Sequence, residues 1–306
     1  MPKVSVIINC HNGERFLKDT IESINNQSFQ DYEIVFWDNA SDDKSAEIVK
    51  KYAKKNLKYF YSRDFLSLGN ARNKAIMQCA GEYIAFLDSD DLWEKEKLCK
   101  QTEILDTNPD IGLVMTNFKT FNMFKNEISG RKEESNRIYI FEEFIKEYAY
   151  CLSTFMIRRS CIEEMNLWFD DRFEYAEEYD FFSRLVFFHK AYYIGIPLVI
   201  RRMHGEMNTI RLAARIPVEH QMALDNLRNN IPNFDQKYPK VVKKIEYIRD
   251  YMNAKYLFQK ENNRRIRKLV KPYIFMEKKA LAYYLIACLP KVVSLKIFNK
   301  IYHNSI

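Results

Sequence analysis

The stretch KVSVIINCHNGERFLKDTIESINNQSFQDYEIVFWDN, residues 3–39, decides the fold because its hydrophobic pattern changes period twice. Residues 4–8 form a short apolar run typical of a buried strand, and residues 14–26 then repeat apolar side chains at helical spacing. A second apolar run follows at 33–37. This strand–helix–strand order is typical of a parallel sheet whose strands are joined by right-handed helical crossovers.

The same alternation continues along the chain. The patterns predict helices at 44–55, 68–80 and 176–188, strands at 58–61, 82–87, 112–117 and 154–157, and an exposed connection at 125–137. From about residue 215 onward only helical patterns occur, with Lys and Arg interleaved among apolar side chains. We therefore predict an α/β domain at 1–212, with halves at 1–110 and 111–212, and a basic helical region at 213–306.

Composition narrows the class of protein. The 306 residues are 47% hydrophobic and include only 7 Gly and 8 Pro, which excludes collagen-like and disordered chains. No apolar run reaches the length of a spanning helix, and the first residues lack the apolar core of a signal peptide. The six cysteines are scattered without a CxxC pair. We expect a cytoplasmic protein with reduced thiols and no zinc module.

The net charge of +7 is distributed unevenly. Residues 241–306 carry 15 Lys and Arg against 4 Asp and Glu, a net +11, whereas residues 1–240 carry a net −4. Such asymmetry indicates that the C-terminal region contacts an anionic partner. No RNA-binding, OB-fold or zinc-finger pattern accompanies the charge, so a nucleic acid is not the expected partner.

Polar, non-repetitive segments follow three of the predicted strands, at 9–12, 38–43 and 88–91. Parallel α/β sheets bind their ligands at the carboxyl ends of the strands, so these segments are the candidate binding loops. No G-x-G-x-x-G follows the first strand, and no G-x-x-x-x-G-K-[ST] occurs. Dinucleotide-dependent dehydrogenases and P-loop NTPases are therefore poorly supported.

The segment Phe86-Leu87-Asp88-Ser89-Asp90-Asp91 is the sharpest of these features. Three carboxylates within four residues at the end of a buried strand repel one another, and a hard divalent cation such as Mg²⁺ or Mn²⁺ would relieve that repulsion. The alternative is an exposed acidic turn in which Asp91 caps the following helix. The position after a strand, beside two other polar loops, favours the metal site.

Three further segments carry candidate residues. Arg72 stands early in a predicted helix, where it would face a phosphate or simply solvent. In the 38–43 loop, Asp38 and Asn39 would accept a hydrogen bond from a base, or form a turn and helix cap. Glu177 and Glu178 open an apolar helix, where burial would suit a general base or where the charges would favour the helix N-terminus.

Taken together, the segments VSVIINCHN, IESINNQSFQDYEIVFWDNASDD, LGNARNKAI and GEYIAFLDSDDLWEKEKL resemble the family 2 glycosyltransferases of the GT-A fold. The likeness is close over about 3–105 and looser to about 210, through the segments at 151–185 and 201–209. It implies a mainly parallel Rossmann-like sheet flanked by helices, with a C-terminal helical subdomain. It also implies an inverting enzyme that moves a sugar from a nucleotide diphosphate to a hydroxyl.

The resemblance implies a role for each matching residue. Asp88 and Asp90 match the DxD motif, with Asp90 as the direct ligand of Mn²⁺ or Mg²⁺, Asp88 nearer the sugar or ribose, and Ser89 between them. His204 matches the His of an R-x-H segment near the metal or diphosphate, and Arg72 the Arg of an A-R-N motif near the diphosphate. The residues that match the base-binding positions are Asn9, Cys10, His11, Asn12, Asp38 and Asn39.

Two positions depart from the family pattern. Asn39 stands where many relatives carry an Asp, and Glu178 stands where they carry the Asp that acts as base, which leaves the choice between Glu177 and Glu178 open. The expected donor is a UDP-sugar carrying a hexose or acetamido-hexose, and the expected acceptor is a bacterial surface glycan or lipid-linked oligosaccharide. The alternative is a catalytically inactive nucleotide-binding or scaffolding protein on the same fold.

The resemblance also suggests two roles for segments outside the motifs. The 118–150 connection or the 203–212 loop would close over the donor. Many relatives act on lipid-linked glycans, so the basic residues of 241–306 together with the apolar run at 280–290 would bind an anionic membrane surface at the inner face of the cell membrane. The alternative for this region is an ordinary helical subdomain with a solvated basic face.

Overall fold

The computed structural model describes residues 1–53, 56–130, 134–148, 150–205, 212, 214–260 and 262–302. The chain divides into two compact units, Met1–Met207 and Asn208–Ile306. Most of the 203–212 loop expected to close over the donor, residues 206–211, lies outside the described residues. Among the helices that are described, none is both long enough and apolar enough to cross a membrane.

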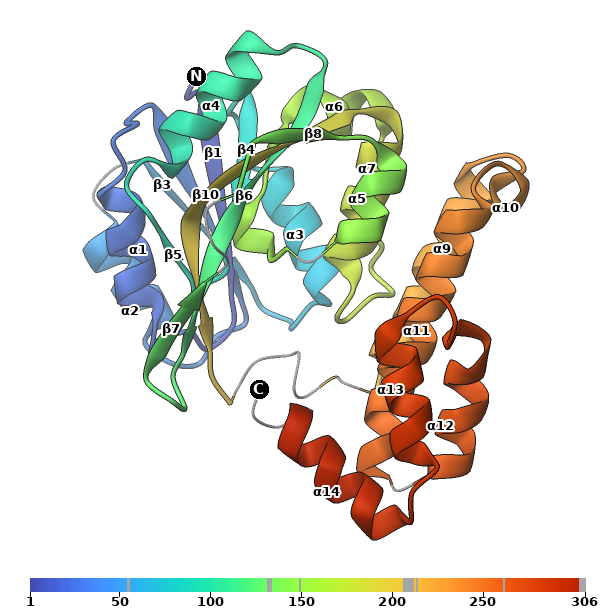
Figure 1. Cartoon of the computed structure of the whole chain (residues 1–306). Coiled ribbons are helices and arrows are strands. Elements are labelled where there is room, and N and C mark those ends of the chain that lie inside the picture. The colour runs from blue at the N-terminus through green and yellow to red at the C-terminus, as the bar shows by residue number, and fades with distance from the viewer. Residues whose placement is uncertain are drawn as a thin grey trace. The chain divides into compact units, whose positions relative to one another are not determined.

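The N-terminal unit is built on one mixed sheet (Figure 1). Its strands are β1 (Val4–Cys10), β2 (Tyr32–Asn39), β3 (Leu57–Ser62), β4 (Tyr83–Phe86), β5 (Leu92–Trp93), β6 (Ile111–Asn122), β7 (Glu127–Gly130), β8 (Arg137–Tyr139), β9 (Met156–Arg158) and β10 (Lys190–Met203). The strand order is β3-β2-β1-β4-β9-β6-β10-β5, with β7 paired to β6 and β8 to β10.

The direction of the strands decides where the functional loops meet. β3, β2, β1 and β4 form parallel pairs, and so do β6 and β10. The short strand β9 is antiparallel to both β4 and β6, so these two also run in the same direction. The predicted mainly parallel sheet is confirmed, and the carboxyl ends of β1, β2, β4 and β10 lie at one edge of it.

Helices cover both faces of this sheet. They are α1 (Leu17–Asn25), α2 (Ser45–Tyr52), α3 (Leu68–Ile76), α4 (Lys97–Thr107), α5 (Phe141–Glu147), α6 (Arg159–Met165) and α7 (Glu177–Phe188), with a 3₁₀ turn η1 (Leu152–Thr154). Figure 1 shows α1 and α2 on one face and α3, α5 and α7 on the other. The first face is closed by a core of buried residues from β1, β2, α1, α2 and α4.

Aromatic side chains close the other face. Phe86 at the end of β4 contacts Phe169 and Phe182 edge to face, with ring centroids 6.1 and 5.9 Å apart. Phe182 also packs on Phe155 at 3.9 Å, and Phe169 stacks on Phe181 at 4.0 Å. All five rings are buried. Aromatic pairs of this kind stabilise a core beyond their buried area, and here they hold α7 against the strand that ends at the acidic turn.

The structure contains elements that the sequence patterns did not predict, including α4, α5, α6, β5, β7, β8 and β10. The expected exposed connection at 125–137 contains β7, which is fully exposed and pairs with β6. Because neither of its faces is buried, its sequence shows no alternation. The long strand β10 was not predicted, because Gly195 and Pro197 interrupt its apolar run where the register shifts against β6.

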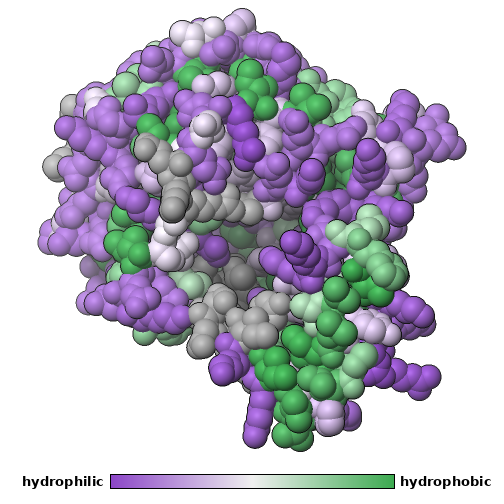
Figure 2. Space-filling model, viewed as in Figure 1, coloured by the Kyte–Doolittle hydropathy of each residue, from purple (hydrophilic) through white to green (hydrophobic). Residues whose placement is uncertain are grey.

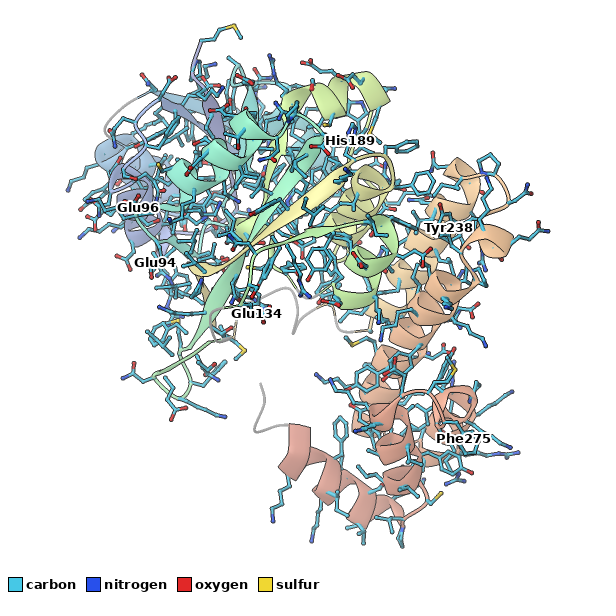
Figure 3. All side chains as sticks on the ribbon, turned by 45° about the horizontal axis from the view of Figure 1, so that its top comes forward. Glu94, Glu96, Glu134, His189, Tyr238 and Phe275 are labelled. Carbon is cyan, nitrogen blue, oxygen red and sulfur yellow. The ribbon has the colours of Figure 1, made fainter. Side chains whose placement is uncertain are left out.

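The C-terminal unit is entirely helical in its described part, as predicted. Its helices are α9 (Ile216–Asn230), α10 (Phe234–Lys237), α11 (Pro239–Gln259), α12 (Asn263–Val270), α13 (Lys278–Ala287) and α14 (Lys291–Tyr302), with a 3₁₀ turn η2 (Lys271–Tyr273). They bury a core of their own. Hydrophobic residues also gather on the outside of this unit (Figure 2), and Phe275, labelled in Figure 3, is 98% exposed.

Candidate active site

The acidic turn after β4 brings three carboxyl groups together. Oxygen atoms of Asp88, Asp90 and Asp91 all lie within 4.8 Å of one another. Asp91 is buried and already occupied, since Oδ2 accepts from the hydroxyl of Ser153 at 2.6 Å and Oδ1 from the backbone N–H of Arg202 at 3.0 Å. It therefore ties the turn to η1 and β10 instead of capping a helix. Asp88 and Asp90 keep 39% and 29% of their side chains exposed.

His204, directly after β10, lies beside the acidic turn. Its Nε2 is 2.8 Å from Oδ2 of Asp90, and its ring lies 4.6 Å from that of Phe16. Arg202 also packs on Phe16, with its guanidinium carbon 5.1 Å from the ring centroid. One imidazole nitrogen and two partly exposed carboxylates form a donor set that suits a small divalent cation, so the residues present fit Mn²⁺ or Mg²⁺.

Arg72 connects the acidic turn to the two glutamates at the start of α7. It is 3% exposed, its NH1 is ion-paired with Oε1 of Glu177, and its NH2 lies 3.5 Å from Oδ1 of Asp88. Glu177 is itself only 2% exposed. A buried carboxylate that is ion-paired with a buried guanidinium is fixed in position, which makes Glu177 a structural partner of Arg72.

Glu178 has a different environment from its neighbour. It is partly exposed, and no hydrogen bond or ion pair to it is recorded among the described residues. Burial, together with the adjacent negative charge of Glu177, raises the pKa of Glu178 to about 8. A carboxylate with a pKa near neutrality, next to an open acidic turn, has the properties of a general base.

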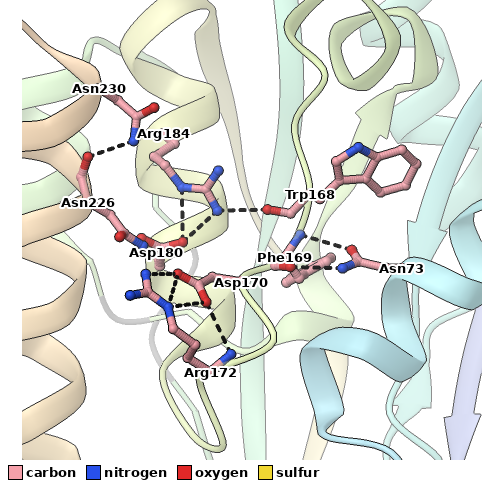
Figure 4. Close-up of polar contacts among 9 residues, drawn as sticks. All are labelled: Asn73, Trp168, Phe169, Asp170, Arg172, Asp180, Arg184, Asn226 and Asn230. Atoms are coloured by element: carbon pink, nitrogen blue, oxygen red, sulfur yellow. Dashed lines mark hydrogen bonds and ion pairs between the residues drawn. The ribbon is translucent and has the colours of Figure 1, made fainter.

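The loop that precedes α7 is held by side chains that the sequence did not single out (Figure 4). The amide of Asn73 exchanges two hydrogen bonds with the backbone of Phe169, at 2.8 and 2.9 Å. Arg184 donates to Asp180 at 2.9 Å and to the carbonyl of Trp168 at 2.8 Å. These contacts position Glu177 and Glu178 relative to α3.

Gly69 allows α3 to approach this loop closely. A Cβ at residue 69 would lie 2.9 Å from the carbonyl oxygen of Asp170, which is closer than side-chain carbons tolerate. The segment LGNARNKAI therefore has a second function besides carrying Arg72. Its Gly69 and Asn73 fix the distance between α3 and the start of α7.

The loops after β1 and β2 are bound to each other. The N–H of Asn12 donates to the hydroxyl of Ser41 at 3.0 Å, and Oδ1 of Asn12 accepts from the N–H of Asp42 at 3.0 Å. Nδ1 of His11 lies 2.9 Å from the carbonyl of Asn39. Asn12 and Ala40 both have left-handed backbone, with φ of 54° and 61°. Strained backbone held by several contacts is common at ligand-binding loops.

The two side chains expected to read a base are largely engaged within the protein. The carboxamide of Asn39 donates to the carbonyl of Leu66 at 3.0 Å and accepts from its N–H at 3.1 Å. Asp38 is buried and accepts from the Tyr59 hydroxyl at 2.6 Å and the Ser41 N–H at 2.9 Å. Both residues thus shape the loops. The exposed ring of His11 lies edge-on to Phe65, with centroids 4.7 Å apart, and Phe65 is 65% exposed.

The remaining residues predicted to bind the donor lie at the end of β1 and in the acidic turn after β4. Cys10 is buried with its Sγ 3.6 Å from the hydroxyl of Ser45, and this burial raises the pKa of its thiol to about 11. Nδ2 of Asn9 is buried and has no hydrogen-bond partner in the described part of the chain. The carbonyl of Ser89 accepts from the hydroxyl of Thr20 at 3.0 Å. All six cysteines are described, and all are free.

Comparison with known proteins gives consistent matches. The model of the glycosyl transferase family 2 matches residues 5–165. An uncharacterized glycosyltransferase of Methanocaldococcus jannaschii is 31% identical over 193 residues, which cover 60% of this chain and 65% of that protein. TuaG of Bacillus subtilis, named as a glycosyltransferase of teichuronic acid biosynthesis, is 38% identical over 106 residues, 34% of this chain and 42% of its own length. The matched region thus spans less than two thirds of each of these relatives.

A solved structure shares the fold. Residues 1–349 of TarS from S. aureus, crystallised in complex with UDP-GlcNAc, superpose with a TM-score of 0.66 over 99% of this chain and 91% of that chain. The sequence identity is 16%, so this match establishes the shared architecture alone. The predicted fold class, GT-A with a C-terminal helical region, is confirmed.

Proposed function

Because the chain belongs to the glycosyl transferase family 2, we propose that it transfers a hexose or acetamido-hexose, with inversion, from a UDP-sugar to a hydroxyl group. The acceptor is a bacterial surface glycan or a lipid-linked oligosaccharide. The observation that carries the proposal is that Asp90 and His204 contact each other in the acidic turn, and that Arg72 links this turn, through Asp88, to the start of α7, where Glu178 stands. The UDP-GlcNAc complex of TarS and the biosynthetic role in the name of TuaG support the donor and acceptor classes.

The donor binds along the carboxyl ends of β1, β2 and β4. The rings of His11 and Phe65 provide a surface against which a pyrimidine stacks, since both are exposed and face each other edge-on. Asn39 keeps one N–H and one oxygen lone pair for the base after its two bonds to Leu66. Asn9, Cys10, Asn12 and Asp38 hold these loops in shape, and Arg72 and Ser89 lie on the side of the diphosphate and sugar.

Asp90 and His204, with Asp88, would hold Mn²⁺ or Mg²⁺, which neutralises the negative charge that develops on the departing diphosphate. Arg72 adds a permanent positive charge next to Asp88. Asp91 keeps the turn fixed to β10 through the N–H of Arg202, so that Asp90 and His204 stay at a constant separation.

Glu178 is the general base. It accepts the proton of the acceptor hydroxyl as the acceptor oxygen bonds to the anomeric carbon and the bond to the diphosphate breaks on the opposite face. A pKa of about 8 makes it a stronger base than an ordinary glutamate. Glu177 does not compete for this role because its side chain is buried and ion-paired with Arg72.

The basic C-terminal region associates with the inner face of the cell membrane, where a lipid-linked acceptor would be presented. Its exposed apolar residues lie among an excess of Lys and Arg, a combination typical of interfacial binding. The protein is then cytoplasmic and peripheral.

Thermal unfolding tests the donor site directly. UDP, dTDP and GDP are added with Mn²⁺ or EDTA to the wild-type protein and to Asp90→Ala. A ligand at a hundred times its Kd stabilises a protein by about 2.7 kcal/mol, so a bound nucleotide raises Tm by several degrees. We expect a metal-dependent shift with UDP that Asp90→Ala abolishes. An absent shift with every nucleotide in folded protein would contradict the proposed donor site.

A further inference from the structure

The C-terminal unit contains a hollow of about 570 Å³ where three helix ends meet. The end of α11, the start of α12 and the turn between α13 and α14 form its walls. The residues that line it are Lys260, Asn262, Asn263, Arg264, Arg267, Leu289, Pro290 and Lys291.

The hollow is held open by side-chain bonds. Asn263 is 7% exposed, and its amide donates to the carbonyl of Leu289 and to the hydroxyl of Ser294, both at 3.0 Å. Arg267 donates to the carbonyl of Ala287 at 2.5 Å. These bonds tie the start of α12 to the end of α13 and the first turn of α14. The shape of the hollow therefore follows from specific contacts.

The described residues that line the hollow give it a strongly positive charge. Four of its lining residues are cationic, and no carboxylate is among the lining residues that the structure describes. None of these four cations has an ion pair within the described chain. The N-terminal ends of α12 and α14 also lie at the hollow, and the N–H groups at a helix start favour an anion, although the N–H of Arg265 is already bonded to Asn262.

Apolar side chains border this positive hollow. Leu289 lines it and is 38% exposed, and Val292 and Val293, directly after Lys291, are 68% and 43% exposed. Leu281 and Leu285 on α13 are exposed as well, at 42% and 57%. Binding of a soluble anion would require only the positive charges of the hollow and not the apolar border. A cationic hollow with an apolar border matches a phosphate group at the surface of a bilayer, where acyl chains begin just below the headgroups.

We infer that this hollow binds the phosphate of an anionic phospholipid headgroup, while Leu289, Val292 and Val293 enter the bilayer interface. The inference deepens the proposed membrane association by naming its binding site, and it rests on that part of the proposed function. The charges of Arg264 and Lys291 contact the phosphate, and the exposed cations elsewhere on α12 contribute only general attraction.

Flotation of the full-length chain with vesicles tests this inference. The vesicles contain phosphatidylcholine, with or without phosphatidylglycerol. The double variant Arg264→Gln/Lys291→Gln removes two charges from the hollow. The matched control, Arg265→Gln/Lys268→Gln, removes two exposed charges from the same helix that do not line it. Val292→Ser leaves every charge in place and removes one apolar side chain of the border.

We expect wild-type protein to float only with phosphatidylglycerol. Each cation near an anionic surface contributes roughly fivefold to binding, so the hollow variant should partition about 30-fold more weakly than wild type. The control should show a clearly smaller loss, because Arg265 and Lys268 do not line the hollow. Val292→Ser should also weaken flotation. Equal losses in the hollow variant and the control would overturn the specific site, since diffuse charge would then explain binding.

Two further results would overturn the inference. One is failure of the wild-type protein to float although UDP and Mn²⁺ still raise its Tm. The proposed donor site would then be unaffected, and only the lipid site would be excluded. The other result has two parts: the protein does not bind vesicles, but inorganic phosphate or a soluble polyol phosphate raises its Tm, and Arg264→Gln/Lys291→Gln abolishes this rise. The ligand of the hollow would then be a soluble anion. The UDP shift, measured on every variant, also shows that the protein is folded.

Discussion

Replacing Glu178 with Gln removes the proposed base while it keeps the size of the side chain. General base catalysis contributes about 100- to 10,000-fold to a rate, so kcat should fall by that factor, which corresponds to about 3–5 kcal/mol of transition-state stabilisation. Nucleotide binding should be unchanged, because Glu178 belongs to α7 and the base-binding loops follow β1 and β2. The assay is release of UDP from a UDP-sugar with Mn²⁺, with Tm measured in parallel.

The pH dependence of the same variant gives a second, independent readout. With a pKa of about 8, Glu178 is only about one-tenth ionised at pH 7, so the wild-type rate should rise about tenfold between pH 7 and pH 9. Folded Glu178 keeps its proton up to about pH 8, whereas an unfolded Glu loses it near 4.5. The folded state therefore loses stability as pH rises between these values, and Glu178→Gln should be more stable than wild type at pH 8.

Glu177→Gln is the matched control. It leaves Arg72 buried without its carboxylate partner, and breaking a buried ion pair costs about 3–5 kcal/mol of stability. Its Tm should therefore fall, whereas that of Glu178→Gln should not. If Glu178→Gln transfers sugar at a near-normal rate while folded Glu177→Gln is inactive, the assignment of the base is wrong.

Three further substitutions test the geometry of the site. Gly69→Ala places a Cβ 2.9 Å from the carbonyl oxygen of Asp170, so unfolding experiments should show a loss of about 1–3 kcal/mol, and unchanged stability would refute the close approach. His204→Gln should weaken Mn²⁺ binding, because it removes the imidazole beside Asp90. Titration calorimetry in the presence of UDP measures this affinity, and an unchanged affinity would exclude a role of His204 in holding the metal. Asn39→Ala should weaken UDP binding and loosen the loop at Leu66, since it removes two hydrogen bonds that contribute about 1 kcal/mol each. Amide hydrogen exchange at Leu66 that stays as slow as in wild type would contradict this.

The order of the early elements could be predicted from the sequence because each of them has a buried face. The strands at the start of the chain are nearly continuous apolar runs, and helix α1 repeats its apolar residues at helical spacing. The strands β7 and β10 were not predicted. The first has no buried face, and the second is interrupted by Gly195 and Pro197, so neither shows a simple period.

The site residues divide in the same way. The acidic turn could be found from the sequence because three carboxylates in four residues are unusual after an apolar strand. The partners that hold Asp91 could not be predicted, because Ser153 and Arg202 are distant from it in the chain. The same holds for Asn73, whose partner Phe169 lies 96 residues further along.

The sequence by itself determined the fold class, the loops that carry polar residues and the pair of glutamates that contains the proposed base. These follow from local periodicity and from which residue types stand at the ends of strands. Only the tertiary structure distinguished Glu177 from Glu178, because adjacent residues of the same type differ solely in what surrounds them. Glu177 lies against the buried Arg72 of α3, and Glu178 remains next to the acidic turn with a raised pKa.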